Sequence, residues 1–249
     1  MMQPTQASPD SLQGRVILVT GAGSGLGREA ALAYARHGAT VALLGRNEKK
    51  LEAVYDEIVA AGGAEPAMFP FDLAAADEGG FERLAGTISY HLKRLDGILH
   101  SAAAFISLTP LSLQSVEEWN TLLKVNLVAP FGLTKACLPL LTASPDASVI
   151  FTGESHGHQP AAYWGGYAVS KAGLEAFSTI LSDELDKTSI RINTLIPGPV
   201  NSPIRRKTHP GELPQQLPQM AELMPWYLWL MGPDSREVRG QIIECAKKK

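Results

Sequence analysis

Cysteine is scarce in this sequence: Cys137 and Cys245 are the two among 249 residues. Cys137 lies in an apolar stretch with helical spacing, and Cys245 lies near the C-terminus. This usage speaks against a disulfide framework, because small folds built on disulfides need several pairs. A chain with reduced thiols and a hydrophobic core fits a cytoplasmic location.

Targeting signals and membrane-spanning runs are also missing by inspection. The first 14 residues are polar and lack the apolar core of a secretory signal. No uninterrupted apolar run approaches the length of roughly 20 residues that is needed to cross a bilayer. We therefore expect a cytoplasmic protein with no membrane partner.

The chain lacks a large excess of positive or negative charge. The chain carries 22 Lys and Arg against 25 Asp and Glu, a formal net charge of −3, with no basic stripe. Nucleic acid is therefore not predicted as a partner. His156 and His158 have no cysteine or third histidine nearby to complete a metal site, so no metal is expected.

Hydrophobic residues are plentiful, at 45% of the chain. A chain of this length and composition can bury the core of one α/β domain. We expect a flexible N-terminal tail over residues 1–13 and a single domain over residues 14–249. A segment rich in proline and polar residues, at about 199–225, is expected to form a mobile lid.

Short apolar runs alternate with longer helical patterns along the domain. Strands that are apolar throughout are buried on both faces, which indicates a parallel sheet between two helical layers. With right-handed crossovers this is a doubly wound Rossmann fold of about seven strands, and its ligands bind beyond the carboxyl ends of the strands. We expect strands at 15–20, 40–44, 67–71, 97–102, 148–152, 190–196 and 240–244, and helices at 25–37, 48–61, 116–141 and 165–186, with another ending near 95.

A glycine-rich turn joins the first strand to the first helix. Gly21, Gly25 and Gly27 follow the spacing Gly-x-x-x-Gly-x-Gly. Glycine lets the backbone turn tightly and approach a pyrophosphate, and the helix N-terminus offers free N–H groups to phosphate. The turn therefore predicts a dinucleotide site; a purely structural turn is the alternative.

The end of the second strand indicates which dinucleotide binds. An NAD site usually places a carboxylate there to accept hydrogen bonds from the ribose 2′-hydroxyl. Here Gly45 is followed by Arg46, whose guanidinium suits a 2′-phosphate. This favours NADP(H) over NAD(H), unless Arg46 is an ordinary surface residue.

Tyr167 and Lys171 form the second key pair. Their i, i+4 spacing places them on one face of a helix. A nearby ammonium lowers the pKa of a phenol, so Tyr167 could exchange a proton with a carbinol or carbonyl oxygen. Taken alone, such a pair is more often a surface feature of a helix.

Together these residues resemble the classical short-chain dehydrogenase/reductase family over about residues 14–245. In detail the chain is similar to a bacterial branch of that family whose substrate is generally unassigned. The order and spacing of the matching pieces are specific to it: residues 20–27, Asp72, residues 100–103, Asn126, Tyr167 with Lys171, residues 197–198 and residues 224–241.

The resemblance implies catalytic roles. Tyr167 would be the general acid/base, and Lys171 would bind the nicotinamide ribose and tune Tyr167. Asn126 would shape the long helix and hold a water in a proton relay to Lys171. The cofactor would contact Gly21, Ser24, Gly25, Leu26, Gly27, Arg46, Asp72, Leu73, Ser101, Ala102, Ala103, Tyr167, Lys171, Pro197, Gly198, Val200 and Ser202.

One of these residues has a second interpretation. Asp72 could accept a hydrogen bond from the adenine amino group, or it could cap the turn that follows the third strand.

The sequence departs from the family at the catalytic serine. That serine normally stands 13 residues before the tyrosine, where this chain has Glu154, with Ser155 next to it. In one interpretation a bulge lets Ser155 supply the hydroxyl. In the other, Glu154 occupies the serine's place, where an ionised carboxylate would repel a developing alkoxide. Such a carboxylate could serve only if it were protonated or if the substrate were cationic.

A further departure follows the fourth strand, where the usual Asn-Ala-Gly is replaced by residues Ser101 to Ala103. Two hypotheses follow. The first is an NADP(H)-dependent oxidoreductase acting on a small carbonyl or alcohol substrate, with reduction favoured. The second is a non-catalytic or weakened NADP(H)-binding protein, a sensor or scaffold. In either case the helices near 116–141 and 165–186 are expected to form a homodimer or homotetramer interface, as in relatives.

Overall fold

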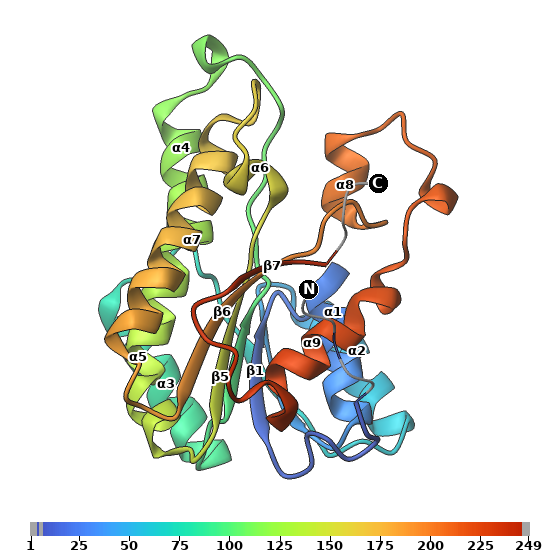
Figure 1. Ribbon diagram of the computed structural model, residues 1–249, viewed down its shortest axis with the longest axis vertical. Helices are drawn as coiled ribbons and strands as arrows, with labels where there is room; N and C mark the ends of the chain where they lie inside the picture. Colours follow the sequence, from blue (N-terminus) through green and yellow to red (C-terminus); the bar gives the residue numbers. More distant parts are fainter. Residues whose placement is uncertain (1–3, 5–6, 246–249) are drawn as a thin grey trace.

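The computed structural model describes residue 4 and residues 7–245, and it shows one parallel sheet of seven strands (Figure 1). The strand order is β3-β2-β1-β4-β5-β6-β7, so the chain winds outward in both directions from β1 and β4. This confirms the predicted doubly wound fold. The strands are β1 Val16–Thr20, β2 Thr40–Gly45, β3 Ala67–Pro70, β4 Gly97–His100, β5 Ala147–Thr152, β6 Ile190–Ile196 and β7 Ile242–Glu244.

Helices cover both faces of the sheet (Figure 1). One layer holds α1 Gly25–Arg36, α2 Glu48–Ala60 and α9 Met224–Met231. The other holds α3 Glu78–Leu92, α5 Ala129–Ala143 and α7 Gly165–Glu184, with α4 Val116–Leu123 packed on α7. Two short helices, α6 Ser155–His158 and α8 Pro203–Thr208, lie beyond the carboxyl ends of the strands.

The alternation of side chains along β1 explains the two cores. Ile17 and Val19 pack in the cluster with α1, α2 and α9, whereas Val16 and Leu18 pack in the cluster with α3, α5 and α7. Successive side chains of a strand point to opposite faces. An uninterrupted apolar strand is therefore what a sheet buried on both sides requires.

The predicted helix at 116–141 is interrupted. A π-helical turn, Lys124–Val128, separates α4 from α5 and contains the buried Asn126. Residues 116–143 also form the one helical stretch in the described part of the chain with the length and composition to cross a membrane. The prediction that no stretch of the sequence is long enough was therefore wrong. That finding is weak evidence for a span, because core helices of globular proteins meet the same criteria, and α5 here packs against α3.

The segment before β1 is packed at its end. Leu12 is fully buried in the core beside α1, and its N–H donates to the carbonyl of His37 over 3.0 Å. The end of the predicted tail is thus part of the folded structure. Residues 1–3, 5–6 and 246–249, which also fall within the predicted tail and domain, lie outside the described residues.

Arg191 on β6 joins the far end of the sheet to α9. Its guanidinium is 1% exposed and donates to the carbonyls of Leu230 at 3.1 Å and Gly232 at 3.0 Å and to the Ser235 hydroxyl. It also forms an ion pair with Asp146 at 3.2 Å. Buried carbonyls of the α9 segment therefore depend on this one cation.

We predict that Arg191→Met lowers the free energy of unfolding by about 3–5 kcal/mol, because it leaves buried acceptors and Asp146 short of a donor. Urea denaturation would measure the change. Arg83→Met is the matched control: Arg83 is 78% exposed and 4.0 Å from Asp77, so its loss should cost less than about 0.5 kcal/mol. Equal losses in the two variants would contradict the role given to Arg191.

Candidate active site

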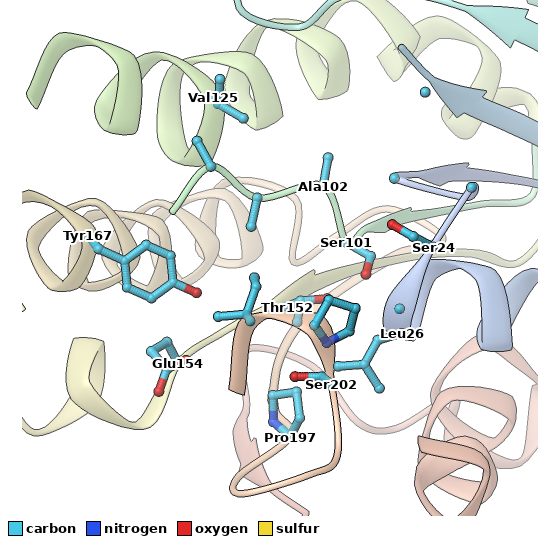
Figure 2. Close-up of a pocket in the computed structure, with 18 of the residues that line it drawn as sticks. Ser24, Leu26, Ser101, Ala102, Val125, Thr152, Glu154, Tyr167, Pro197 and Ser202 are labelled. Atoms are coloured by element: carbon cyan, nitrogen blue, oxygen red, sulfur yellow. The ribbon is translucent and has the colours of Figure 1, made fainter. Parts of the chain in front are cut away.

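A cavity of about 470 Å³ opens at the carboxyl ends of the strands (Figure 2). Its walls come from the loops after β1, β2, β3, β4, β5 and β6, and from α4, α7 and α8. Ligands of doubly wound sheets bind at this edge. Of the residues predicted for the site, the following line it: Gly21, Ser24, Gly25, Leu26, Arg46, Leu73, Ser101, Ala102, Ala103, Ser155, Tyr167, Lys171, Pro197, Gly198, Val200 and Ser202.

The glycine turn sits where side chains would not fit. Gly21 has a φ of +70°, and a Cβ built there would lie 2.9 Å from the Cα of Ala102. A Cβ at Gly27 would lie 2.5 Å from the Gly21 carbonyl oxygen. Gly27 therefore packs beneath the turn instead of lining the cavity. The turn leaves a bare backbone cradle at the N-terminus of α1, which suits a pyrophosphate.

The loop after β4 is fixed to the end of β1. The hydroxyl oxygen of Thr20 accepts hydrogen bonds from the backbone N–H groups of Ser101 and Ala102, each over 3.0 Å. These contacts hold the altered Ser101–Ala103 segment against the glycine turn, although it lacks the family's asparagine and glycine.

Arg46 and Lys50 line the end of the cavity next to β2. Arg46 is exposed, and its side chain makes no hydrogen bond or ion pair with any described residue. The described lining of this end contains no carboxylate. A free guanidinium and an ammonium fit a 2′-phosphate better than a ribose diol.

Asp72 shows the turn-capping contact. Its Oδ1 accepts a hydrogen bond from the Ala74 N–H over 3.0 Å, and its side chain is exposed outside the cavity lining. Its neighbours Phe71, Leu73 and Ala74 line the cavity instead.

Tyr167 and Lys171 project from one face of α7 into the other end of the cavity (Figure 2 shows Tyr167). Both are buried, at 4% and 3% exposure. The ammonium of Lys171 donates to the carbonyl of Thr152 over 2.8 Å. Burial lowers the pKa of Lys171 to about 8, against the opposing effect of the carboxylates of Glu154 and Glu175.

The pKa of Tyr167 moves in the direction opposite to the one we predicted. Burial, and then the charge of Glu154, raise the pKa of the phenol above its ordinary value. Desolvation disfavours the phenolate form, and this effect outweighs the attraction of the Lys171 ammonium.

Asn126 lies behind the cavity wall. Its Oδ1 accepts from the Ala104 N–H over 2.7 Å, and its Nδ2 donates to the Ala104 carbonyl and the Ser170 hydroxyl, each over 3.0 Å. Asn126 thus ties the loop after β4 to α7. A role in shaping the long helix agrees with its place in the π-helical turn.

Glu154 and Ser155 both line the cavity, directly after β5. Glu154 occupies the N-cap position of α6 but makes no side-chain capping bond. Its Oε1 lies 3.4 Å from Nδ1 of His156. Figure 2 shows Glu154 beside Tyr167, at the same end of the cavity. The Glu154 carboxylate and the Ser155 hydroxyl are thus the two candidates for the place of the family's catalytic serine.

The short helix α6 is locked to α7. A Cβ at Gly157 would lie 2.7 Å from the Cβ of Lys171, so the two backbones touch. One residue on, Nδ1 of His158 pairs with the Oε2 of Glu175 over 2.9 Å. Glu175 is buried and stands one helical turn after Lys171. This contact fixes the segment that carries Glu154 and Ser155 relative to the Tyr167 and Lys171 pair.

Several lining residues escaped the sequence analysis. Thr152 and Gly153 could have been found as the end of a buried strand, and Lys50 as a second cation one turn from Arg46. Gly45 and Glu154 stand beside predicted site residues but were not themselves assigned to the site. The other lining residues are Gly23, Leu44, Asn47, Leu51, Phe71, Ala74, Ala104, Thr121, Val125, Trp164, Pro203, Ile204, Arg205, Lys207 and Thr208.

A glycine cradle at one end of the cavity and a buried tyrosine and lysine at the other define a dinucleotide-dependent oxidoreductase of the Rossmann class. The family model described as short chain dehydrogenase matches residues 15–213. This chain belongs to that family.

Individual proteins similar to this chain are also oxidoreductases or short chain dehydrogenases. The chain is 44% identical to the "uncharacterized oxidoreductase YciK" of Escherichia coli K12 over 240 residues, which is 96% of this chain and 95% of that protein. A short chain dehydrogenase of E. coli CFT073 solved with NADPH superposes with a TM-score of 0.94 at 43% identity, over 96% of this chain and 100% of that one. One from Shigella flexneri 2a strain 301, solved with NADP, gives 0.93 at 43% identity, over 95% and 99%.

The His158 and Glu175 contact should stabilise the fold in a pH-dependent way. The hydrogen bond that the His158 ring donates to the Glu175 carboxylate raises the pKa of His158 above its ordinary value of 6.5 in the folded protein. The contribution is therefore fully present below the unfolded-state pKa and is lost as the pH rises through the folded-state pKa. We predict that His158→Gln lowers the free energy of unfolding more at pH 5.5 than at pH 8.5, measured by urea denaturation.

His91→Gln supplies the control, because His91 is exposed on α3 and faces no carboxylate in its described contacts. A cost of His158→Gln that is the same at both pH values would show that the imidazole packs there without pairing as a cation.

Proposed function

We propose that this protein is an NADP(H)-dependent oxidoreductase that interconverts a small carbonyl compound and the corresponding alcohol. The observation that carries the proposal is one continuous cavity, lined by the glycine turn and Arg46 at one end and by Tyr167 and Lys171 at the other. The relatives solved with NADP and NADPH support the same cofactor. When bound, the nicotinamide would supply or accept the hydride.

The residues of this chain would bind the cofactor and exchange the proton. The backbone from Gly21 to Gly25 and the N-terminus of α1 would hold the pyrophosphate, and Arg46 with Lys50 would hold the 2′-phosphate. Tyr167 would exchange the proton at the substrate oxygen. The ammonium of Lys171 lies at the same end of the cavity as Tyr167. It would favour the phenolate form of Tyr167 when cofactor and substrate are bound.

A non-catalytic or weakened NADP(H)-binding protein is the second candidate. Glu154 favours it, because a carboxylate beside Tyr167 raises the pKa of the phenol and opposes negative charge on a substrate oxygen. The buried Tyr167 and Lys171 pair favours the enzyme, since burying a cation is costly for a fold that makes no use of it.

We further propose a cytoplasmic homodimer or homotetramer. Large apolar side chains are exposed on α5 and α7, at Phe131 (47%), Val169 (46%) and Ile180 (58%), with Val128 just before α5 (43%). Apolar side chains exposed on neighbouring helices suit a self-complementary interface between copies of the chain.

Removing the Arg46 guanidinium should weaken the binding of NADPH but not that of NADH. We predict that Arg46→Ala weakens NADPH binding about 10- to 100-fold, the range of a hydrogen bond to a charged group, and leaves NADH binding within about twofold. Isothermal titration of each cofactor measures this. Lys49→Ala removes the same charge from an exposed neighbour outside the cavity lining and should change neither affinity. A wild-type protein that binds NADH more tightly would refute the NADP(H) assignment.

Removing the phenolic hydroxyl should stop chemistry but not cofactor binding. We predict that Tyr167→Phe lowers kcat/KM for NADPH-dependent carbonyl reduction about 10²- to 10⁴-fold, with an unchanged Kd for NADPH. The control is Tyr163→Phe, which removes the same atom from a side chain that is 58% exposed. Turnover that persists in Tyr167→Phe would contradict the proposed mechanism.

A further inference from the structure

The reacting end of the cavity contains a carboxylate with no strong partner. Glu154 is the one carboxylate among the described residues that line the cavity. No lysine or arginine of the described chain lies within 4.0 Å of it, and its one polar contact, to Nδ1 of His156, is long at 3.4 Å. Its side chain is 23% exposed, so the charge is only partly hydrated. A ligand group could therefore become its main partner.

Aromatic rings lie at the same end of the cavity as this carboxylate. Trp164 lines the cavity, is 6% exposed and stacks on His156 with ring centroids 3.8 Å apart. The Tyr167 ring lies 6.0 Å from Trp164 and meets Phe105 edge to face at 5.2 Å. The face of an aromatic ring carries partial negative charge and attracts cations. Aromatic rings together with a carboxylate therefore favour the binding of an organic cation.

The nearby cations of the protein are mostly engaged elsewhere. Arg205 on α8 binds Glu212 through two hydrogen bonds, one of them 2.7 Å long. Lys171 donates to the Thr152 carbonyl, and burial followed by the charge of Arg205 lowers the pKa of His209, which keeps this imidazole neutral near pH 7. Lys207 also lines the cavity from α8, but it is exposed to solvent. Glu154 is therefore a more buried charge of this cavity than Lys207.

The charge of Glu154 already acts on its neighbours. Burial is the larger cause of the raised pKa of Tyr167, and the charge of Glu154 adds to it, so negative charge near the phenol oxygen is disfavoured there. A neutral ketone develops such charge on its oxygen as it is reduced. A substrate that brings its own positive charge to this point avoids the repulsion, because the carboxylate then stabilises it.

We propose that the substrate of this site is an organic cation, a ketone with an ammonium group on the carbon next to the carbonyl, held by Glu154 at the end of the cavity that Trp164 lines. The inference rests on the proposed function, since it assigns the substrate class of that same oxidoreductase site. Glu154 would thereby select substrates by charge at the position where the family places a hydroxyl.

The test compares three probes of similar size and different charge: benzylamine, benzyl alcohol and benzoate. Ligand-observed NMR titration at pH 7.5 gives the Kd of each for the protein saturated with NADP⁺. We expect benzylamine to bind about tenfold more tightly than benzyl alcohol, which corresponds to one partly buried charge contact, and benzoate to bind most weakly. Glu154→Gln should abolish the preference for benzylamine and leave the affinity for benzyl alcohol within about twofold.

The control variant is Glu117→Gln, which removes an exposed charge from α4 and should leave all three affinities unchanged. A Glu154 that only supports the fold would shift the affinities for benzylamine and benzyl alcohol together. Equal binding of these two probes by the wild type, or tighter binding of benzoate, overturns the proposal.

Turnover separates this inference from the proposed function. NADPH consumption is compared for two ketones, the permanently cationic phenacyltrimethylammonium and neutral acetophenone. Preferred turnover of the cation supports the inference. Turnover of acetophenone alone, dependent on Tyr167, together with no charge preference among the probes, leaves the proposed function standing and refutes the inference. A charge preference among the probes with no turnover of any compound refutes the function and keeps the cation site.

Discussion

The site depends on bare backbone at the places where strand-end loops meet. Gly21 lies against Ala102, and Gly157 lies against Lys171, at distances that leave no room for a Cβ. The hydroxyl of Thr20 then holds the loop after β4 in place through two backbone N–H groups. Because each of these contacts involves main-chain atoms, the cavity keeps its shape although the residues that line it depart from the family pattern.

Electrostatics then differ between the two ends of the cavity. The end next to β2 presents Arg46 and Lys50 without a carboxylate in the described lining, which suits phosphate. The end next to β5 presents a buried phenol, a buried ammonium and Glu154. Burial acts on the phenol and the ammonium in opposite directions, raising the pKa of one and lowering that of the other. This end of the cavity is therefore where the chain differs chemically from an ordinary member of its family.

The short helix α6 connects that difference to the fold. It carries Ser155 and follows Glu154, and it is held against α7 by the close approach of Gly157 and by the His158 and Glu175 pair. Burial lowers the pKa of Lys171 and the charge of Glu175 opposes that shift, so the group that fixes α6 acts on the ammonium as well. Position and charge at the reacting end are thus set by the same few contacts.

Much of this was predictable from the sequence, because the signals are local. Apolar strands, the glycine spacing and the i, i+4 pair of Tyr167 and Lys171 each follow from short-range geometry, and together they determined the sheet, the cofactor edge and the candidate acid/base. The tertiary structure decided what depends on distant contacts: the π-helical turn at Asn126, the burial of Leu12 and the direction of the Tyr167 pKa. Desolvation and main-chain approach arise only when segments far apart in the chain are packed together, and no local pattern encodes them.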